Sequence, residues 1–300
     1  MRVLTILCAT AVVLAAGGSA PKVVAKIRSP LSPCAAVAAA DAVWVTSYAE
    51  GSVFRIDRRT NKVTARVRVG RTPCGLVAGA RSLWVNGYGT NTVERVNPRT
   101  RKLVGRIRVG RSPFDVLFAA GSVWTTNNGS GTVSRISPRT NRVIRTIRTP
   151  GGPAGLGFAG GGVWVGTNAS GDVYRIDPAT NAVAKVPLGT GRPAWLATSA
   201  QDVWVSNGLD GTVTRIDAAT REVVATVKVG GLPVDGAVAP DGLVWIPNKS
   251  DSTISIIDPA RNTVTATLRS GAGPFVVSTA FGDMWAPSYD GRDVWRYELD

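Results

Sequence analysis

The chain has 300 residues, with 35 Lys and Arg against 20 Asp and Glu, a formal net charge of +15 and no histidine. The missing histidine removes the commonest general base and the commonest neutral metal ligand, which excludes histidine-based catalysis and histidine-held metal sites. The length allows one to three ordinary domains, but a repeat that covers nearly the whole chain favours one large domain.

Residues 1–20 have the organisation of a secretory signal peptide. Arg2 supplies a positive n-region, residues 3–16 are apolar, and residues 17–20 are small enough for a cleavage site. The apolar stretch is shorter than the roughly 20 residues that a transmembrane helix needs. We therefore expect no transmembrane segment, and a mature protein over residues 21–300 that is secreted or held in the cell envelope.

Short apolar runs separated by turns follow the signal peptide. The first runs cover residues 22–28, 33–40, 42–47, 52–57 and 62–69. The turn before the last of these runs opens with Asp57, and similar turns begin at Asn97, Asp177 and Asp258. An Asx side chain in a turn accepts a backbone N–H, and a following proline presets φ. These aspartates are therefore predicted to be structural and not catalytic.

A tryptophan flanked by apolar residues marks every repeat. The copies are Trp44, Trp84, Trp124, Trp164, Trp204, Trp245 and Trp285, spaced by 40 residues with one step of 41. A fixed period of this length, built from short strands and Gly/Pro turns, is typical of a β-propeller with one four-stranded blade per repeat. We expect the tryptophans to pack each blade against the next one.

The last repeat is short of one strand, and the N-terminal segment supplies a match for it. The chain ends at residue 300, soon after the third strand of the seventh repeat, whereas residues 22–28 resemble the outermost strand over residues 62–68. Pairing of the two ends would hide a sheet edge and hold both termini. The predicted fold is therefore all-β, a seven-bladed propeller over residues 21–300, closed by the N-terminal strand joining the C-terminal blade.

The repeat unit reads Val-Trp-Val-x-Asn, then Gly-Thr-Val-x-Arg-Ile-Asp-Pro-x-Thr-Asn, then an apolar run that ends in Val-Gly-x-x-Pro. Its clearest copies cover residues 130–140, 171–181 and 211–220. The unit resembles YVTN-type β-propeller repeats over nearly the whole mature chain, and it is similar also to the streptogramin (virginiamycin B) lyase propellers. The lyase resemblance implies a histidine base with a carboxylate and a magnesium ion. This chain has no histidine to supply that base.

Two sets of residues are candidates for binding a ligand at the channel mouth. Tyr48, Tyr88 and Tyr289 lie four residues after the repeat tryptophan in three consecutive blades, where they could stack on sugar rings or bases, or merely close their own hairpins. Asp115, Trp195 and Asp235 break a small and apolar series two residues after the strand-opening proline. They would line the channel as a binding site or simply solvate it. With the two carboxyls three blades apart, we expect them to be too distant to share a proton.

Cys34 and Cys74 occupy the same repeat position on adjacent blades. In an oxidising compartment they could form a disulfide, provided that their Cα atoms lie within about 7 Å. The alternative is two buried thiols that never meet. Two thiols without histidine do not favour a metal site, and we expect no cofactor.

Basic residues concentrate in blades one to three. Residues 43–162 hold 20 Lys and Arg against 4 Asp and Glu, whereas residues 163–300 hold 11 against 15. The outermost strands of these blades and the turns before them form a basic sector that consists of Arg58, Arg59, Lys62, Arg66, Arg68, Arg99, Arg101, Lys102, Arg106, Arg108, Arg139 and Arg142. Such a field attracts polyanions, and charged outer strands also prevent sheets from pairing edge to edge.

The sequence favours an exported, non-catalytic binding or scaffold protein of the cell envelope, expected to be a monomer. Its basic sector would contact an anionic polymer, such as nucleic acid or a phosphate polymer, or a protein partner. The alternative is a streptogramin-lyase-like enzyme acting at the channel mouth, near Asp115, Trp195, Asp235 and the three tyrosines. A scaffold that contacts proteins only is a third possibility.

Overall fold

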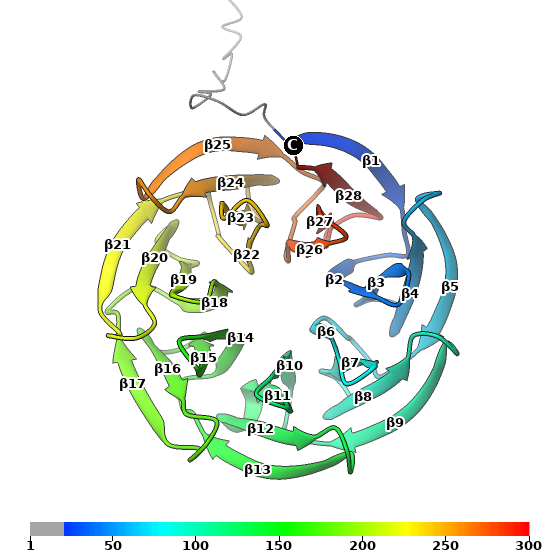
Figure 1. Ribbon diagram of the computed structural model, residues 1–300, viewed down its shortest axis with the longest axis horizontal. Helices are drawn as coiled ribbons and strands as arrows, with labels where there is room; N and C mark the ends of the chain where they lie inside the picture. Colours follow the sequence, from blue (N-terminus) through cyan, green and yellow to red (C-terminus); the bar gives the residue numbers. More distant parts are fainter. Residues whose placement is uncertain (1–20, 300) are drawn as a thin grey trace, which may run out of the picture.

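A computed structural model describes residues 21–299 as a ring of seven four-stranded antiparallel sheets around a central channel (Figure 1). The predicted seven-bladed propeller is confirmed. The signal peptide expected over residues 1–20 lies outside the described residues. Over residues 21–299 no helix has the length and apolar character needed to cross a membrane.

Blades one to four each run from an inner strand at the channel to an outer strand at the rim. Blade one consists of β2 (Pro33–Ala39), β3 (Ala42–Ser47), β4 (Ser52–Asp57) and β5 (Lys62–Arg68). Blade two consists of β6 (Leu76–Gly79), β7 (Ser82–Gly87), β8 (Thr92–Asn97) and β9 (Lys102–Arg108). Blade three consists of β10 (Pro113–Ala119), β11 (Ser122–Asn127), the short 3-10 helix η1 (Asn128–Ser130), β12 (Thr132–Ser137) and β13 (Arg142–Arg148). Blade four consists of β14 (Pro153–Ala159), β15 (Gly162–Thr167), β16 (Asp172–Ile176) and β17 (Val183–Pro187).

The remaining blades follow the same order from channel to rim. Blade five consists of β18 (Pro193–Thr198), β19 (Asp202–Asn207), β20 (Thr212–Asp217) and β21 (Val223–Lys228). Blade six consists of β22 (Ala237–Val238), β23 (Val244–Asn248), β24 (Thr253–Asp258) and β25 (Thr263–Arg269). Blade seven consists of β26 (Ser278–Ala280), β27 (Asp283–Pro287), β28 (Asp293–Glu298) and, from the other end of the chain, β1 (Lys22–Arg28).

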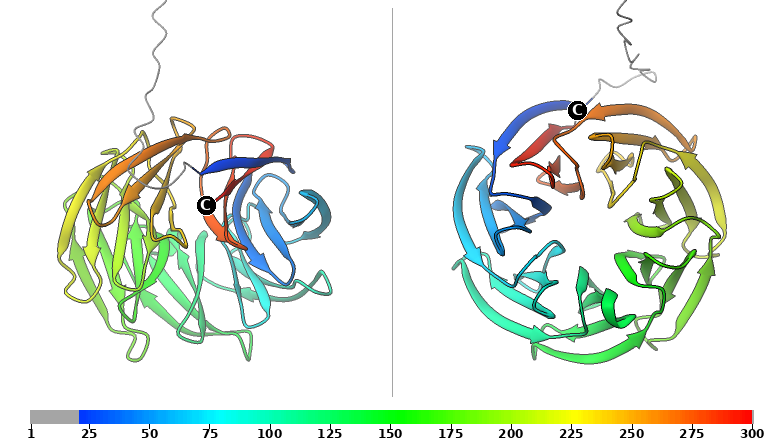
Figure 2. Two further views of the ribbon diagram at one scale, coloured as in Figure 1. Left: turned by 45° about the horizontal axis from the view of Figure 1, so that its top comes forward. Right: turned by 180° about the vertical axis from the view of Figure 1, so that it is seen from behind.

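The ring closes as the sequence predicts. β1 pairs antiparallel with β28, from Lys22 opposite Glu298 to Arg28 opposite Asp293 (Figures 1 and 2). Ile27 of β1 is 3% exposed and joins the apolar cluster that holds Trp285. The closing strand therefore covers the edge of β28 and ties the first described residues to the last.

The repeat tryptophans form the interfaces between blades, as expected. All seven are at most 1% exposed. Trp44 of blade one lies in a cluster with Leu83 and Val85 of blade two, and Trp285 of blade seven lies in a cluster with Val43 of blade one. Burial of each such side chain stabilises the ring by about 2–3 kcal/mol. The indole of Trp84 also donates a hydrogen bond to the Gly79 carbonyl, at 3.0 Å.

The turns between the third and fourth strands use Asx side chains as predicted. Asp57 Oδ1 accepts from the backbone N–H groups of Arg59 and Thr60, at 3.0 and 2.9 Å. Asp177 and Asp217 accept in the same way from the residues two and three positions on. These backbone hydrogen bonds hold the pKa of each carboxyl below its ordinary value. The aspartates are structural, in agreement with the sequence analysis.

The inner strands leave certain residues out of regular pairing at the channel. In blade three the register shifts between Pro113 and Val116, so that Phe114 and Asp115 are not paired with residues of β11 in the register of the sheet. In blades six and seven the inner segments are joined to each other: the Asp235 N–H donates to the Phe275 carbonyl at 3.2 Å, and the Val277 N–H to the Asp235 carbonyl at 3.1 Å. These irregular segments carry Phe114, Asp115, Asp235 and Phe275, which line the centre of the ring.

Candidate functional site

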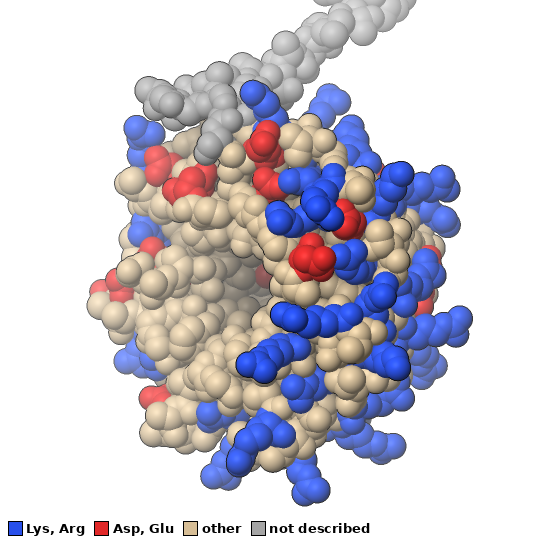
Figure 3. Space-filling model, turned by 45° about the vertical axis from the view of Figure 1, so that its right-hand side comes forward, with Lys and Arg blue, Asp and Glu red and all other residues tan. Residues whose placement is uncertain are grey.

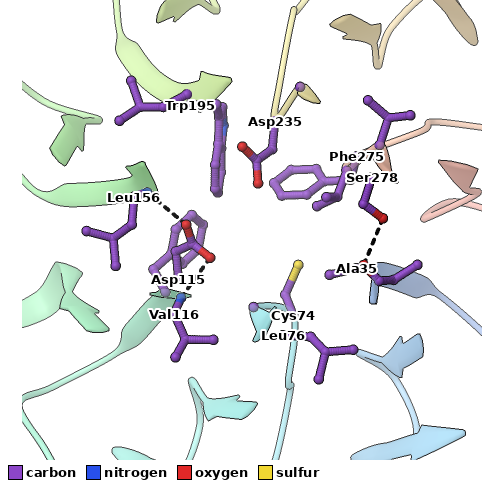
Figure 4. Close-up of a pocket in the computed structure, with 17 residues that line it drawn as sticks. Ala35, Cys74, Leu76, Asp115, Val116, Leu156, Trp195, Asp235, Phe275 and Ser278 are labelled. Atoms are coloured by element: carbon purple, nitrogen blue, oxygen red, sulfur yellow. Dashed lines mark hydrogen bonds between the residues drawn. The ribbon is translucent and has the colours of Figure 1, made fainter. Parts of the chain in front are cut away.

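A cavity of about 180 Å³ occupies the centre of the ring, lined by residues of the inner strands (Figure 4). Asp115 and Asp235 both point into it, Asp115 from β10 and Asp235 from the segment before β22. The rings of Phe114, Trp195 and Phe275 form part of the same wall. The structure thus brings together all three channel residues that the sequence analysis singled out.

The backbone holds the Asp115 carboxyl in place. Its Oδ1 accepts from the Val116 N–H at 2.7 Å, and its Oδ2 from the Leu156 N–H of the next blade at 2.8 Å. The side chain keeps some exposure towards the channel, yet protein surrounds it on the other sides. Burial therefore raises the pKa of Asp115 to about 6, although both hydrogen bonds oppose the shift.

The pKa of Asp235 is raised by the same buried surroundings and by Asp115. Burial raises its pKa well above the ordinary value, the charge of Asp115 raises it further, and a hydrogen bond from the backbone of Leu196 partly opposes both. No hydrogen bond joins the two carboxyls within residues 21–299. The two carboxyls were expected to be too far apart to share a proton, but that expectation did not include the electrostatic interaction of their charges across the channel. This interaction arises because three blades of separation along the ring is a short distance at its centre.

Six aromatic rings form a continuous arc at the channel mouth. The order is Tyr48, Tyr289, Phe275, Trp195, Phe114 and Tyr88, with successive centroids 5.4, 5.4, 4.8, 5.1 and 5.7 Å apart. These separations lie in the range of favourable aromatic pairs. The three predicted tyrosines are thereby connected to Trp195, which is 7% exposed at the middle of the arc.

Phe114 and Phe275 complete the arc, and neither was predicted from the sequence. Each directly follows the strand-opening proline, where the other blades have Cys34, Cys74, Ala154, Ala194 and Val234. The sequence pattern that marks these two residues therefore lies at the position directly after the proline, one residue before the position that Asp115, Trp195 and Asp235 occupy. Two large aromatics among small side chains break the repeat in the same way as Asp115 and Asp235 do.

The rim of the mouth beside Tyr289 carries an ion pair. Lys249 Nζ lies 2.9 Å from Asp290 Oδ2 and 5.3 Å from the centroid of the Tyr289 ring. Burial, followed by the nearby Tyr48 and Asp290, raises the pKa of Tyr289 to about 12. Tyr289 therefore keeps its proton at neutral pH and can donate a hydrogen bond.

The basic sector forms an exposed surface on one side of the ring. All twelve of its side chains are exposed, and Figure 3 shows lysine and arginine covering the side that carries β5 and β9. Two of the twelve form salt bridges in the part of the chain that the structure describes, Arg66 with Glu50 and Arg106 with Glu94. The other ten have no carboxylate partner there, so their charges are available to a ligand.

A groove of about 390 Å³ crosses this basic surface between blades one and two. Its polar lining consists of the guanidinium groups of Arg71, Arg106 and Arg108 and the hydroxyls of Thr90 and Thr92. Guanidinium groups and hydroxyls are the donors that bind phosphate oxygens. Within the described residues Arg106 pairs with Glu94, the Thr92 hydroxyl donates to Glu94 Oε1 and Arg71 donates to the Gly89 carbonyl, so Arg108 is the guanidinium group of the groove that has no partner there.

Cys34 and Cys74 lie on adjacent inner segments, with Cys34 fully buried and Cys74 in the lining of the central cavity. Their Cα atoms are 5.2 Å apart, inside the range that a disulfide spans, and the structure joins their sulfurs. The bond links blade one to blade two across 40 residues of sequence. No cluster of three or more His, Cys, Asp and Glu side chains suited to a metal ion occurs within residues 21–299.

Comparison with known proteins supports the fold. No protein-family model matches the chain, and no curated protein matches it in sequence. Among solved structures, a streptogramin B lyase superposes with a TM-score of 0.80 at 14% identity, covering 92% of this chain and 97% of that one. Virginiamycin B lyase from Staphylococcus aureus gives 0.80 at 13%, covering 92% and 99%. The WD40 β-propeller domain of Doa1 gives 0.80 at 12%, covering 93% and 97%. At these identities the likeness defines the class, a seven-bladed β-propeller, and not an activity.

Proposed function

We propose that this protein is an exported, non-catalytic propeller of the cell envelope that binds an anionic polymer through its basic sector. The observation that carries the proposal is the set of exposed, unpaired arginines and lysines on β5, β9, β13 and their turns. Edge protection explains why outer strands are charged, but β17, β21 and β25 are outer strands as well and carry few basic residues. The charge on blades one to three, which β1 of the neighbouring blade seven extends with Lys22, Lys26 and Arg28, instead forms one continuous field.

Phosphate polymers are the ligand chemistry that this surface fits best. Each neutralised phosphate releases a counterion, so a row of guanidinium groups gains affinity without reading a sequence. In the groove Arg108 offers a guanidinium group without a partner among the described residues, beside Arg71 and Arg106, which each keep further N–H donors. If the polymer is a nucleic acid, the aromatic arc at the channel mouth provides rings on which bases can stack.

Charge reversal tests the proposal. Arg99, Arg108 and Arg142 are exposed, belong to the basic sector and make no salt bridge within the described residues, so the triple change to Glu is expected to leave the fold intact. A matched control changes Arg221, Arg269 and Arg292 to Glu, which alters the net charge equally but in blades five to seven. Fluorescence anisotropy with a labelled polyphosphate and a short single-stranded oligonucleotide measures both variants.

We expect the basic-sector variant to lose at least about tenfold in affinity and the control to lose much less, because local contacts outweigh net charge at physiological salt. Equal losses of affinity in the two variants would mean that binding depends on the net charge of the protein and not on the basic sector. No binding by the wild type at low salt would refute the proposal.

A lyase-like enzyme acting at the channel mouth is the second candidate. It is favoured by Asp115, whose pKa of about 6 suits a general acid or base near neutral pH, next to a continuous aromatic surface. Two similar solved structures are a streptogramin B lyase and a virginiamycin B lyase. Lyase turnover of streptogramin B by the wild type, lost in Asp115→Ala and Asp235→Ala, would support this candidate. Absence of turnover would leave the binding proposal.

A further inference from the structure

The central cavity differs in charge from the rest of the molecule. Among the residues that line it, the ionisable ones are Asp115 and Asp235, and Cys74 is joined to Cys34. Within residues 21–299, burial, backbone hydrogen bonds and the other carboxyl are the causes that shift the pKa of these two groups. Although the chain has a net charge of +15, no lysine or arginine among residues 21–299 forms a salt bridge with either of these two carboxyls.

The wall of the cavity adds aromatic faces to these carboxyls. The centroid of the Trp195 ring lies 5.1 Å from that of Phe114 and 4.8 Å from that of Phe275. All three rings border the space into which the carboxyls point (Figure 4). The face of an aromatic ring attracts cations, and carboxylates together with such faces are the usual surroundings of a bound organic ammonium group. A volume of about 180 Å³ admits a small molecule and not a polymer.

We propose that this cavity binds a small primary ammonium compound, with Asp115 and Asp235 accepting hydrogen bonds from the ammonium group beside the aromatic wall. Asp115 retains acceptor capacity after its two backbone hydrogen bonds, because a carboxylate has about four lone-pair sites. The alkyl part of the ligand lies against Phe114, Trp195 and Phe275. The site is separate from the basic sector and takes a ligand of the opposite charge.

Binding of a cation here is linked to protons. Because a protonated carboxyl attracts an ammonium group weakly, binding requires ionised carboxyls and releases protons where these are partly protonated. Around the cavity the other charged or titratable groups among the described residues are Arg192, Lys249 and Asp290 beyond the aromatic wall, and the three tyrosines of the arc, Tyr48, Tyr88 and Tyr289, of which Tyr289 keeps its proton to a pH of about 12. The affinity should therefore fall as the pH decreases through the range near 6 in which Asp115 takes up its proton.

Isothermal titration calorimetry of the full chain with n-propylammonium chloride tests the proposal. The control ligand is n-propanol, which has the same shape and no charge, and sodium chloride keeps the ionic strength constant. We expect saturable binding of the ammonium compound at about pH 8, weaker by at least about tenfold at about pH 5, and none of the alcohol. Titrations in two buffers of different ionisation enthalpy should reveal proton release near pH 6. This readout needs no variant.

Variants then locate the site. Asp115→Asn and Asp235→Asn keep the side-chain shape and should each weaken binding by at least about tenfold, whereas Asp241→Asn, a change of an exposed carboxylate in a turn, should leave it unchanged. Three results would overturn the proposal: no saturation at about pH 8, equal affinity for n-propanol, or binding that both cavity variants retain in full.

Discussion

Arg135 Nη1 of blade three donates a hydrogen bond to Asn181 Oδ1 in the turn of blade four, at 3.0 Å, and to the Pro178 carbonyl at 2.6 Å. The guanidinium group also lies 4.8 Å from the centroid of the Trp124 ring in its own blade. One side chain thus joins the tryptophan of one blade to the Asx turn of the next. The same contact recurs at Arg95 with Asn141, Arg215 with Asn262 and Arg296 with Asn61.

The exceptions follow from the neighbouring blade. In blades two and five the turn residue is an arginine, Arg101 or Arg221, instead of an asparagine. The arginines of the blades before them bind elsewhere: Arg55 pairs with Asp41, and Arg175 donates to the Gly160 carbonyl. Blade six has Ile256 in place of the arginine, and the blade beyond it has no such turn, because its outer strand β1 comes from the other end of the chain. The arginine therefore contacts the next turn where that turn offers an asparagine, and it is replaced where the next blade has no such turn.

Asn181→Ala should lower the stability of the protein by about 1–2 kcal/mol, since it removes the hydrogen bond to Arg135 and leaves a partly buried charge without that partner. Arg221→Ala is the control, because it changes the same turn position, also at positive φ, where no arginine donates. Thermal unfolding measures both. A loss of equal size in the two variants would contradict an interblade role for Asn181.

Trp124→Ala should destabilise the ring by about 3–5 kcal/mol, because a fully buried indole leaves a cavity between blades three and four. Phe281→Ala, a change of a 40% exposed ring, should cost less than about 1 kcal/mol. The midpoint of chemical denaturation, followed by circular dichroism, measures the difference. Similar midpoints for the two variants would show that the tryptophans do not hold the interfaces.

Breaking the contact between Cys34 and Cys74 should cost about 3–4 kcal/mol, as expected for a disulfide that closes a loop of 40 residues. Unfolding of the Cys34→Ser, Cys74→Ser double variant measures this loss. Peptide mapping of the wild type without reductant should recover the two cysteines in one linked product. Recovery of both as free thiols from protein secreted into an oxidising compartment would contradict the bond.

The carboxyls of the channel should make stability depend on pH. Because burial raises the folded-state pKa of Asp115 to about 6 and that of Asp235 well above its ordinary value, both favour folding in their protonated form. This contribution is complete below the unfolded-state pKa near 4 and is lost as the pH rises through the folded-state values.

The double variant Asp115→Asn, Asp235→Asn lacks this dependence. Its melting temperature should match that of the wild type more closely at about pH 4 than at about pH 8, where the variant should be the more stable protein. Thermal scans at several pH values measure the gap between the two. A gap that stays constant from acid to neutral pH would mean that the channel carboxyls are not perturbed.

The sequence predicts the fold well because the repeat supplies several agreeing signals. The tryptophan period, the Asx turns and the match of residues 22–28 to an outer strand together define the blades and their closure. The aromatic arc is harder to predict, since Phe114 and Phe275 meet Trp195 only after the ring brings blades three, five and seven together. The interaction of Asp115 with Asp235 likewise depends on the narrow centre of the ring, which spacing along the chain does not reveal.

The most direct test of polyanion binding is the salt dependence of the affinity for a single-stranded oligonucleotide. A plot of log K against log salt concentration should be linear, with a slope of about −0.7 for each phosphate contacted. We predict a slope of magnitude about 3 or more for the wild type and the control variant, and a markedly shallower one when Arg99, Arg108 and Arg142 are changed to Glu. A flat dependence, or equal slopes in all three proteins, would contradict the assignment of the basic sector as the binding surface.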